Sequence, residues 1–232
     1  MKTYYRHVVI GGTYYGCGLA AVDPENTLVV EPSILVGSDF SMNFNPGTQW
    51  DYMPSHPDTF RFRNELEQRN VINDGKVHQP AMTPVFSKWC LDAGLHVALA
   101  SNVLEYDEHS MTLFDANGRH EVSFDRITDA RPVHGKTKRI TASIFTDSIR
   151  CGGDYGIFQI VDGLFDSEAF LLIDIADTTS WPEARLTLFN VWQERPEKLS
   201  RCSVAAVGVR FDYNNFSNPL VALDRGLGGG NK

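Results

Sequence analysis

Several features that would identify a class of protein are missing from this sequence of 232 residues. No apolar run approaches the roughly 20 residues that a helix needs to cross a bilayer, and the N-terminal segment lacks the apolar core of a secretory signal. No long basic run is present, and the formal net charge is -8. Such a charge disfavours general nucleic-acid binding, because neutralising phosphates requires a basic surface. We therefore expect a cytoplasmic protein that binds neither membranes nor nucleic acid.

Signatures of metal and hydrolytic chemistry are missing as well. The four cysteines lie far apart with no C-x-x-C, which predicts reduced structural thiols and no zinc site: Cys17, Cys90, Cys151 and Cys202. The seven histidines show no metal-ligand spacing. No G-x-S-x-G, P-loop lysine or H-E-x-x-H is found, so motifs assign neither a metal nor a catalytic residue.

The first 32 residues carry the strongest structural pattern. A short β-branched strand is expected over 7–10, a small-residue helix over 14–22 and a second apolar strand over 27–31. A crossover of this length requires parallel pairing, and it should be right-handed.

Local patterns predict further elements, namely a helix over 58–69 capped by Asp58, a helix from Thr83-Pro84 to Gly94, a strand over 95–100, a hairpin around 115–118 and a strand over 127–130. From about residue 135 to residue 200 the segments are strand-like, including 184–194. The order predicts an α/β fold, with a parallel sheet and a β-meander followed by a smaller, mostly antiparallel section. We expect one domain over 1–134 and 203–232, and a small substrate or partner domain over 135–202.

The glycines of the first turn predict a dinucleotide site. Gly11 permits a tight turn after the first strand, and Gly16 permits close packing of the helix on the sheet. The helix N-terminus then presents N–H groups to a pyrophosphate. Glu31 follows Gly11 by twenty positions, at the end of the second strand, where a carboxylate accepts hydrogen bonds from ribose hydroxyls.

The turn departs from the usual G-x-G-x-x-G at its middle glycine. Thr13 stands there and adds a branched side chain, which would either donate its hydroxyl to a phosphate or fill the space. Tyr14 and Tyr15 follow, and we expect at least one of them to stack on a ligand or to plug the site.

The segment "VVIGGTYYGCGLA…LVVEPSILVGSDF" resembles the amino end of FAD-dependent oxidoreductases of the two-dinucleotide-binding-domain type. The segments 83–106 and 111–131 are also similar to that family, and Asn214–Gly226 resembles its closing segment, which returns to the flavin. The resemblance implies a Rossmann-like domain that binds FAD through residues of the first turn and beyond: Gly11, Gly12, Thr13, Tyr14, Tyr15, Gly16, Glu31, Pro32, Gly37, Ser38, Asn102, Val103, Ala130 and Arg131. Ala130-Arg131-Pro132 replaces the family's Ala-Thr-Gly, so the glycine that allows close approach is gone, and Arg131 is available to pair with phosphate.

Three functions stay open at this point. The first is an FAD-dependent oxidoreductase, or a subunit of one, acting on an unknown small organic substrate. The second is a non-catalytic binding or assembly subunit of flavoprotein fold that has lost FAD, and the third is an NAD(P)-binding protein. A homo-oligomer and a hetero-complex are both compatible with the sequence. Among the histidines, His134 lies nearest the predicted site.

Overall fold

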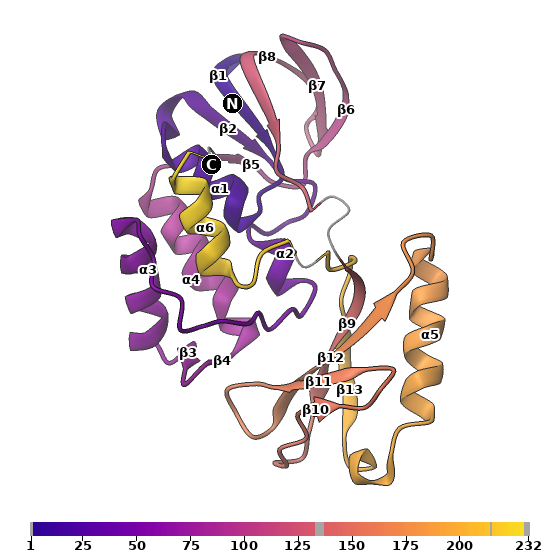
Figure 1. The fold of residues 1–232 in the computed structure, drawn as a ribbon. Helices are drawn as coiled ribbons and strands as arrows, with labels where there is room; N and C mark the ends of the chain where they lie inside the picture. Colours follow the sequence, from indigo (N-terminus) through magenta and orange to yellow (C-terminus); the bar gives the residue numbers. More distant parts are fainter. Residues whose placement is uncertain (1, 133–136, 214, 230–232) are drawn as a thin grey trace.

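The computed structural model describes residues 2–132, 137–213 and 215–229, which form two sheets with helices packed against them (Figure 1). The larger sheet has six strands in the order β5-β2-β1-β8-β7-β6. The smaller has five strands in the order β10-β11-β12-β9-β13. The α/β fold with a second, antiparallel section, as the sequence predicted, is confirmed.

The predicted βαβ unit forms the centre of the larger sheet. Strand β1 (Tyr4–Ile10) pairs in parallel with β2 (Thr27–Val30), and helix α1 (Tyr14–Ala21) with a short 3-10 turn at Pro24–Asn26 connects them. Strand β5 (His96–Ala98) extends the parallel part beside β2. Both strands of the βαβ unit are buried along most of their length. Their apolar runs favour this position inside the sheet.

The β-meander forms the other half of the larger sheet. It consists of β6 (Asn102–Tyr106), β7 (Ser110–Asp115) and β8 (Gly118–Asp129). The predicted hairpin is confirmed, since Asp115 pairs with Gly118 across the turn. The separate strand predicted over 127–130 is wrong. These residues continue β8, which runs unbroken for 12 residues because it pairs with β7 first and then with β1.

Helices cover one face of the larger sheet (Figure 1): α2 (Ser38–Ser41), α3 (Pro57–Gln68), α4 (Gln79–Asp92) and α6 (Pro219–Leu227). Two predicted helix starts need correction. The ring of His56, rather than Asp58, caps α3 by accepting the Asp58 N–H. Helix α4 begins at Gln79, four residues before Thr83. Its first turn contains Pro80, a position that suits proline, and Pro84 lies in the helix interior.

Helices α1 and α6 cross at unusually close range. A Cβ added at Gly18 would lie 2.6 Å from the Leu223 carbonyl oxygen, and one added at Gly226 would lie 2.3 Å from the Tyr15 carbonyl oxygen. Glycine is therefore required at both positions of the crossing. The crossing brings the C-terminal helix against the helix of the βαβ unit.

The smaller sheet is antiparallel and consists of β9 (Lys138–Phe145), β10 (Gly153–Asp154), β11 (Gln159–Asp162), β12 (Glu168–Ile175) and β13 (Ser203–Val207). A 3-10 turn at Glu197–Leu199 precedes β13. The strand-like interpretation of 184–194 is wrong, because α5 (Trp181–Gln193) occupies this stretch. Ser180 and Glu183 form a capping box at its start, and the buried side chains recur every four residues.

The two sheets are joined by side chains and by backbone hydrogen bonds. The ring of His78 lies 3.2 Å from the carboxylate of Glu168, just beyond the short hairpin of β3 (Ile72–Asn73) and β4 (Lys76–Val77). The Val209 N–H donates to the Met42 carbonyl oxygen at 3.0 Å. The Thr141 hydroxyl donates to the Asn43 carbonyl oxygen. The domain limits given above remain a proposal.

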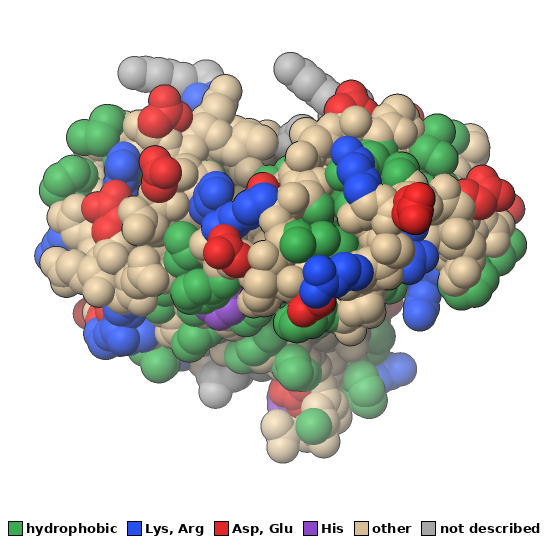
Figure 2. Space-filling model, turned by 90° about the horizontal axis from the view of Figure 1, so that it is seen from below, with side chains coloured by type: hydrophobic (Ala, Val, Ile, Leu, Met, Phe, Trp, Pro, Cys, Tyr) green, Lys and Arg blue, Asp and Glu red, His purple; other side chains and the backbone are tan. Residues whose placement is uncertain are grey.

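The surface carries charges of both signs. The face in Figure 2 shows acidic and basic side chains interspersed among apolar ones, with no extended basic patch in view. In the described part of the chain, no helix is both long enough and apolar enough to span a membrane.

Candidate functional site

The glycine turn at the carboxyl end of β1 has the geometry that the sequence predicted. Gly11 has φ +107°, and a Cβ there would lie 2.9 Å from the Arg131 amide nitrogen. A Cβ at Gly16 would lie only 2.2 Å from the Gly11 carbonyl oxygen. Both positions therefore require glycine, which lets α1 begin directly above the end of the sheet.

Thr13 caps α1 with the side chain that departs from the usual motif. Its hydroxyl accepts the Gly16 N–H at 2.9 Å and donates to the Ala130 carbonyl oxygen at 3.1 Å. The hydroxyl thus has an internal acceptor and an internal donor, and it links the turn to the end of β8. Thr13 is a structural cap in this arrangement, with its side chain 3 % exposed.

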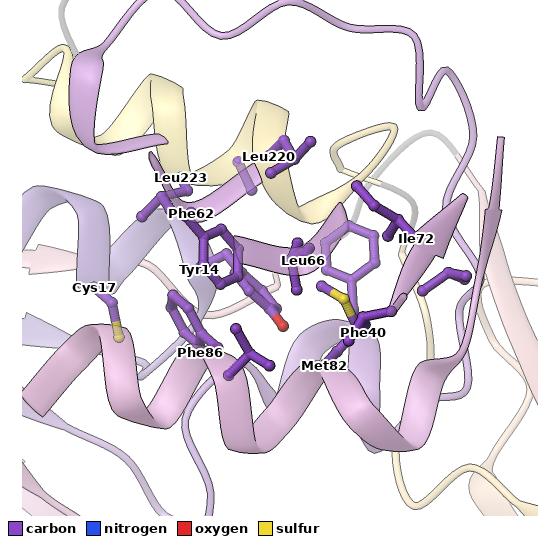
Figure 3. Close-up of a cluster of buried hydrophobic side chains, with 14 of the residues drawn as sticks. Tyr14, Cys17, Phe40, Phe62, Leu66, Ile72, Met82, Phe86, Leu220 and Leu223 are labelled. Atoms are coloured by element: carbon purple, nitrogen blue, oxygen red, sulfur yellow. The ribbon is translucent and has the colours of Figure 1, made fainter. Parts of the chain in front are cut away.

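The two tyrosines point in different directions. Tyr14 is fully buried and stacks on Phe86 with 3.9 Å between ring centroids, inside the hydrophobic cluster of Figure 3. It belongs to the core between α1 and α4 and is removed from the groove in front of the turn. Tyr15 is half-buried and stacks on Phe216 at 5.5 Å. Phe216 lines the cavity described below, so Tyr15 supports its wall.

Glu31 lies just beyond β2 with its side chain almost completely buried. Its Oε2 accepts the Gly12 N–H at 2.8 Å, and its Oε1 accepts the Ser33 N–H at 2.8 Å. The Ser38 hydroxyl lies 3.5 Å from the same Oε1. A Cβ at Gly12 would lie 2.9 Å from the Glu31 Cβ, so the turn and the acid fit closely together.

An arginine from the opposite end of the chain completes this network. Arg210 Nη2 donates to Glu31 Oε1 at 3.0 Å, and its Nη1 lies 3.3 Å from the Ser38 hydroxyl. The two charged residues are separated by 179 positions in the sequence. No local pattern predicts this pairing, because nothing around residue 210 resembles a ligand motif.

A small polar cavity of about 30 Å³ lies beside Thr13. It is lined mostly by polar side chains, which come from the turn, from 39–45, from the end of β8 and from 212–216: Thr13, Asp39, Phe40, Asn43, Asn45, Ala130, Pro132, Asp212, Tyr213, Asn215 and Phe216. Asp39 Oδ1 and Asn43 Oδ1 are buried and have no hydrogen-bond partner among the described residues. Buried acceptors without partners are rare in proteins, and a donor such as a bound water molecule or a ligand hydroxyl would satisfy them.

Burial raises the pKa of Asp39 to about 7. The backbone N–H groups of Asp39 and Tyr14 act in the opposite direction, while the negative charges of Glu31 and Asp212 reinforce the rise. Tyr14 is the first residue of α1, so the Asp39 carboxyl lies near the helix end that favours an anion. Sequence reasoning missed Asp39, Asn43 and Arg210, and only their positions in space relate them to the turn.

The other predicted residues surround this site or lie away from it. The Gly37 N–H donates to the Gly12 carbonyl oxygen at 2.6 Å, which places Gly37 and Ser38 beside the turn. Ala130 lines the cavity, whereas Arg131 forms an ion pair with Asp129 at 2.6 Å and is exposed. Among the fourteen predicted site residues only Thr13 and Ala130 line the cavity, so Pro32, Asn102 and Val103 are among those that do not. His134 lies outside the described residues.

Other parts of the molecule offer weaker candidates. A cavity of about 920 Å³ lies under the β7–β8 hairpin, open to solvent and lined by side chains of both charges, including His96 and His120. None of the predicted site residues lines it. The four cysteines are free and buried, and no cluster of metal-binding side chains occurs within the described ranges.

The residues present can be tested against FAD, the cofactor that the resemblance implies. The turn keeps the tightly packed backbone of a dinucleotide-binding motif at Gly11 and Gly16, and the partnerless acceptors Asp39 Oδ1 and Asn43 Oδ1 fit hydroxyl donors. The present cavity has room for about one water molecule. A flavin would therefore have to separate the segments 39–45 and 212–216.

Comparisons with known proteins support the fold. No family model and no curated protein sequence matches the chain. Solved structures do match, among them a flavoprotein/dehydrogenase from Cytophaga hutchinsonii, with a TM-score of 0.62 and 13% identity over 98% of this chain and 77% of that one. An L-proline dehydrogenase from P. horikoshii gives a TM-score of 0.58 and 10% identity over 97% and 92% of the two chains.

A third match is an aklavinone-11 hydroxylase whose structure contains FAD and aklavinone, with a TM-score of 0.56 and 11% identity over 89% of this chain and 53% of that one. By their names, two of these neighbours are dehydrogenases, one of them called a flavoprotein, and the third is a hydroxylase of flavoprotein fold with bound FAD. The chain has that fold over most of its length.

Proposed function

We propose that this chain is an FAD-dependent oxidoreductase, or the cofactor-holding subunit of one, acting on a small organic substrate in the cytoplasm. The observation that carries the proposal is the pair of buried acceptors, Asp39 Oδ1 and Asn43 Oδ1, facing a cavity beside the glycine turn of a flavoprotein fold. The N-terminus of α1 would face the diphosphate, and Glu31 would face the ribose of the adenosine.

When bound, FAD would supply the electron transfer itself. The residues of this chain then have to hold and orient the cofactor and exclude water. Asp39 and Asn43 would accept hydrogen bonds from its hydroxyl groups, and Gly11 would keep the tight turn that directs the N-terminus of α1 toward it. No general acid or base is assigned among the described residues.

The test is a titration of the purified protein with FAD, followed by flavin fluorescence and by the absorbance spectrum. We expect saturable binding, and either a yellow protein as isolated or one that becomes yellow with FAD. NADPH is titrated in parallel, because an NAD(P)-binding protein with the same βαβ unit would bind NADPH and ignore FAD. A colourless protein that binds neither ligand contradicts both assignments.

The second candidate function is a non-catalytic binding or assembly subunit. It is favoured by the internal pairing of Glu31 with Arg210 and by the small size of the cavity. The variant Thr13→Gly separates the two functions. If FAD binds only to Thr13→Gly, the native turn excludes the cofactor, and the non-catalytic function is the better assignment.

A further inference from the structure

The carboxylate of Glu31 is covered by the groups that donate to it. Its Oε1 accepts the Ser33 N–H, the Arg210 guanidinium and, at the longer distance of 3.5 Å, the Ser38 hydroxyl. Its Oε2 accepts the Gly12 N–H. Because Glu31 is only 1 % exposed, a ribose hydroxyl can reach this carboxylate only if one of the covering groups moves away.

The four donors differ in how easily they can leave. Gly12 and Ser33 donate from backbone on either side of the turn, and a Cβ at Gly12 would already lie against Glu31, so this backbone is tightly placed. Ser38 is the weakest donor, since its hydroxyl is 3.5 Å away. Arg210 contributes a long side chain that is about one-third exposed, and it is the donor that can swing away.

The segment around Arg210 is held against the loop after α2. The Val209 N–H donates to the Met42 carbonyl oxygen at 3.0 Å, and the side-chain amide of Asn43 donates to the Phe211 carbonyl oxygen at 3.1 Å. These contacts hold the segment in front of the cavity that Asn43 lines. The Arg210–Glu31 ion pair therefore adds a charged contact to the hydrogen bonds that hold 208–212 against 38–45.

We propose that Arg210 is a latch on the dinucleotide groove, which competes with the ribose of an adenine dinucleotide for Glu31 and must release this carboxylate before the adenosine end binds. The inference rests on the proposed function for the identity of the ligand. The contact itself rests only on the geometry of Glu31, Ser38 and Arg210. Backbone hydrogen bonds of Gly208 to Thr141 and of Asp212 to Arg139 keep the 208–212 segment in place, so the release concerns the Arg210 side chain.

The experiment uses Arg210→Met, which keeps the length of the side chain and removes its charge. ADP is the main probe, because it carries the ribose and diphosphate without the flavin, and FAD is titrated beside it. We expect at least a tenfold lower Kd for both ligands in Arg210→Met. Arg201→Met is the matched control, because Arg201 pairs with Asp147 on an exposed surface, and its Kd values should equal those of the wild type.

Hydrogen exchange without added ligand tests the latch independently of binding. Backbone amides of 33–38, which include the Ser33 N–H bound to Glu31, should exchange at least tenfold faster in Arg210→Met and at the wild-type rate in Arg201→Met. Arg210→Lys retains the charge with a poorer grip on the carboxylate, so it should lie between the two in both assays. It also replaces Arg210→Met if that variant fails to fold.

The outcomes separate the latch from the proposed function. If the wild type binds FAD and Arg210→Met binds FAD and ADP no more tightly, the latch is overturned and the proposed function stands. Unchanged exchange in 33–38 also overturns the latch. If exchange accelerates but no variant binds ADP or FAD, the proposed function and the competition with ribose both fall.

Discussion

The two ends of the groove in front of the glycine turn are closed in different ways. At the Glu31 end, four donors satisfy a buried carboxylate, and the closure is made of hydrogen bonds. At the Asp39 end, packing closes the space to about 30 Å³ and leaves Asp39 Oδ1 and Asn43 Oδ1 without partners among the described residues. One end has the polar partners that a buried charge needs, and the other end lacks them.

This difference indicates where a ligand would gain most on binding. At the Glu31 end a ligand has to displace an existing ion pair, so the net gain is small. At the Asp39 end a ligand would supply hydrogen bonds that the chain does not make, and relieving a buried unsatisfied acceptor contributes about 1–3 kcal/mol. Binding would therefore be favoured at the Asp39 end and opposed by the existing ion pair at the Glu31 end.

The largest expected effect concerns the turn on which both ends depend. Gly16→Ala places a Cβ 2.2 Å from the Gly11 carbonyl oxygen, so backbone has to shift. We expect the free energy of unfolding to fall by about 3 kcal/mol, although alanine is the better helix former. Denaturant unfolding measures the change. Gly228→Ala, where the nearest atom is 3.4 Å away, is the control and should change the free energy by less than about 0.5 kcal/mol.

A second, smaller effect is specific to the Asp39 end and depends on pH. The pKa of Asp39 is about 7 in the folded protein and about 3.8 as a free side chain. Between these values the folded state binds the extra proton, so stability falls as pH rises from about 4 to 7 and levels off above 7. Asp39→Asn removes this contribution. Between pH 4 and pH 7 the free energy of unfolding of the variant should rise by about 2 kcal/mol relative to that of the wild type, a value reduced for solvent screening.

The measurement is chemical unfolding of both proteins at intervals from pH 4 to pH 8. Other groups titrate in this range, among them His7, whose pKa burial lowers to about 4, so only the difference between variant and wild type is interpreted. Asp74→Asn, on an exposed turn, is the control and should follow the wild type at every pH. A constant difference between Asp39→Asn and wild type would show that Asp39 ionises normally.

The smallest effect tests whether Thr13 belongs to the scaffold or to the ligand site. Thr13→Val keeps the shape and removes the hydroxyl that links Gly16 to Ala130, so it should lower the free energy of unfolding by about 1 kcal/mol. Thr13→Ser keeps the hydroxyl and should cost less than about 0.5 kcal/mol. Thermal unfolding compares the two variants. Equal melting temperatures would show that the cap contributes little.

The sequence predicted the parts of the fold that local patterns specify. The βαβ unit was predictable because Gly11, the small-residue helix and the two apolar strands lie within about 30 residues. The hairpin at Asp115–Gly118 was predictable because its turn residues fix the register. The helix over 181–193 was missed, because its apolar residues are dense enough to suggest a strand, and the capping box at Ser180 and Glu183 was the signal that distinguishes the two.

By itself the sequence determined the turn, its glycines and the position of Glu31 at the end of β2. These features depend on backbone conformation over short distances, which residue types such as glycine restrict directly. Only the tertiary structure decided what meets that carboxylate. Arg210 reaches it across 179 positions, and Asp39 approaches the start of α1 only because α2 folds back over the turn. Pairings of this kind depend on the packing of the whole chain, which no local pattern contains.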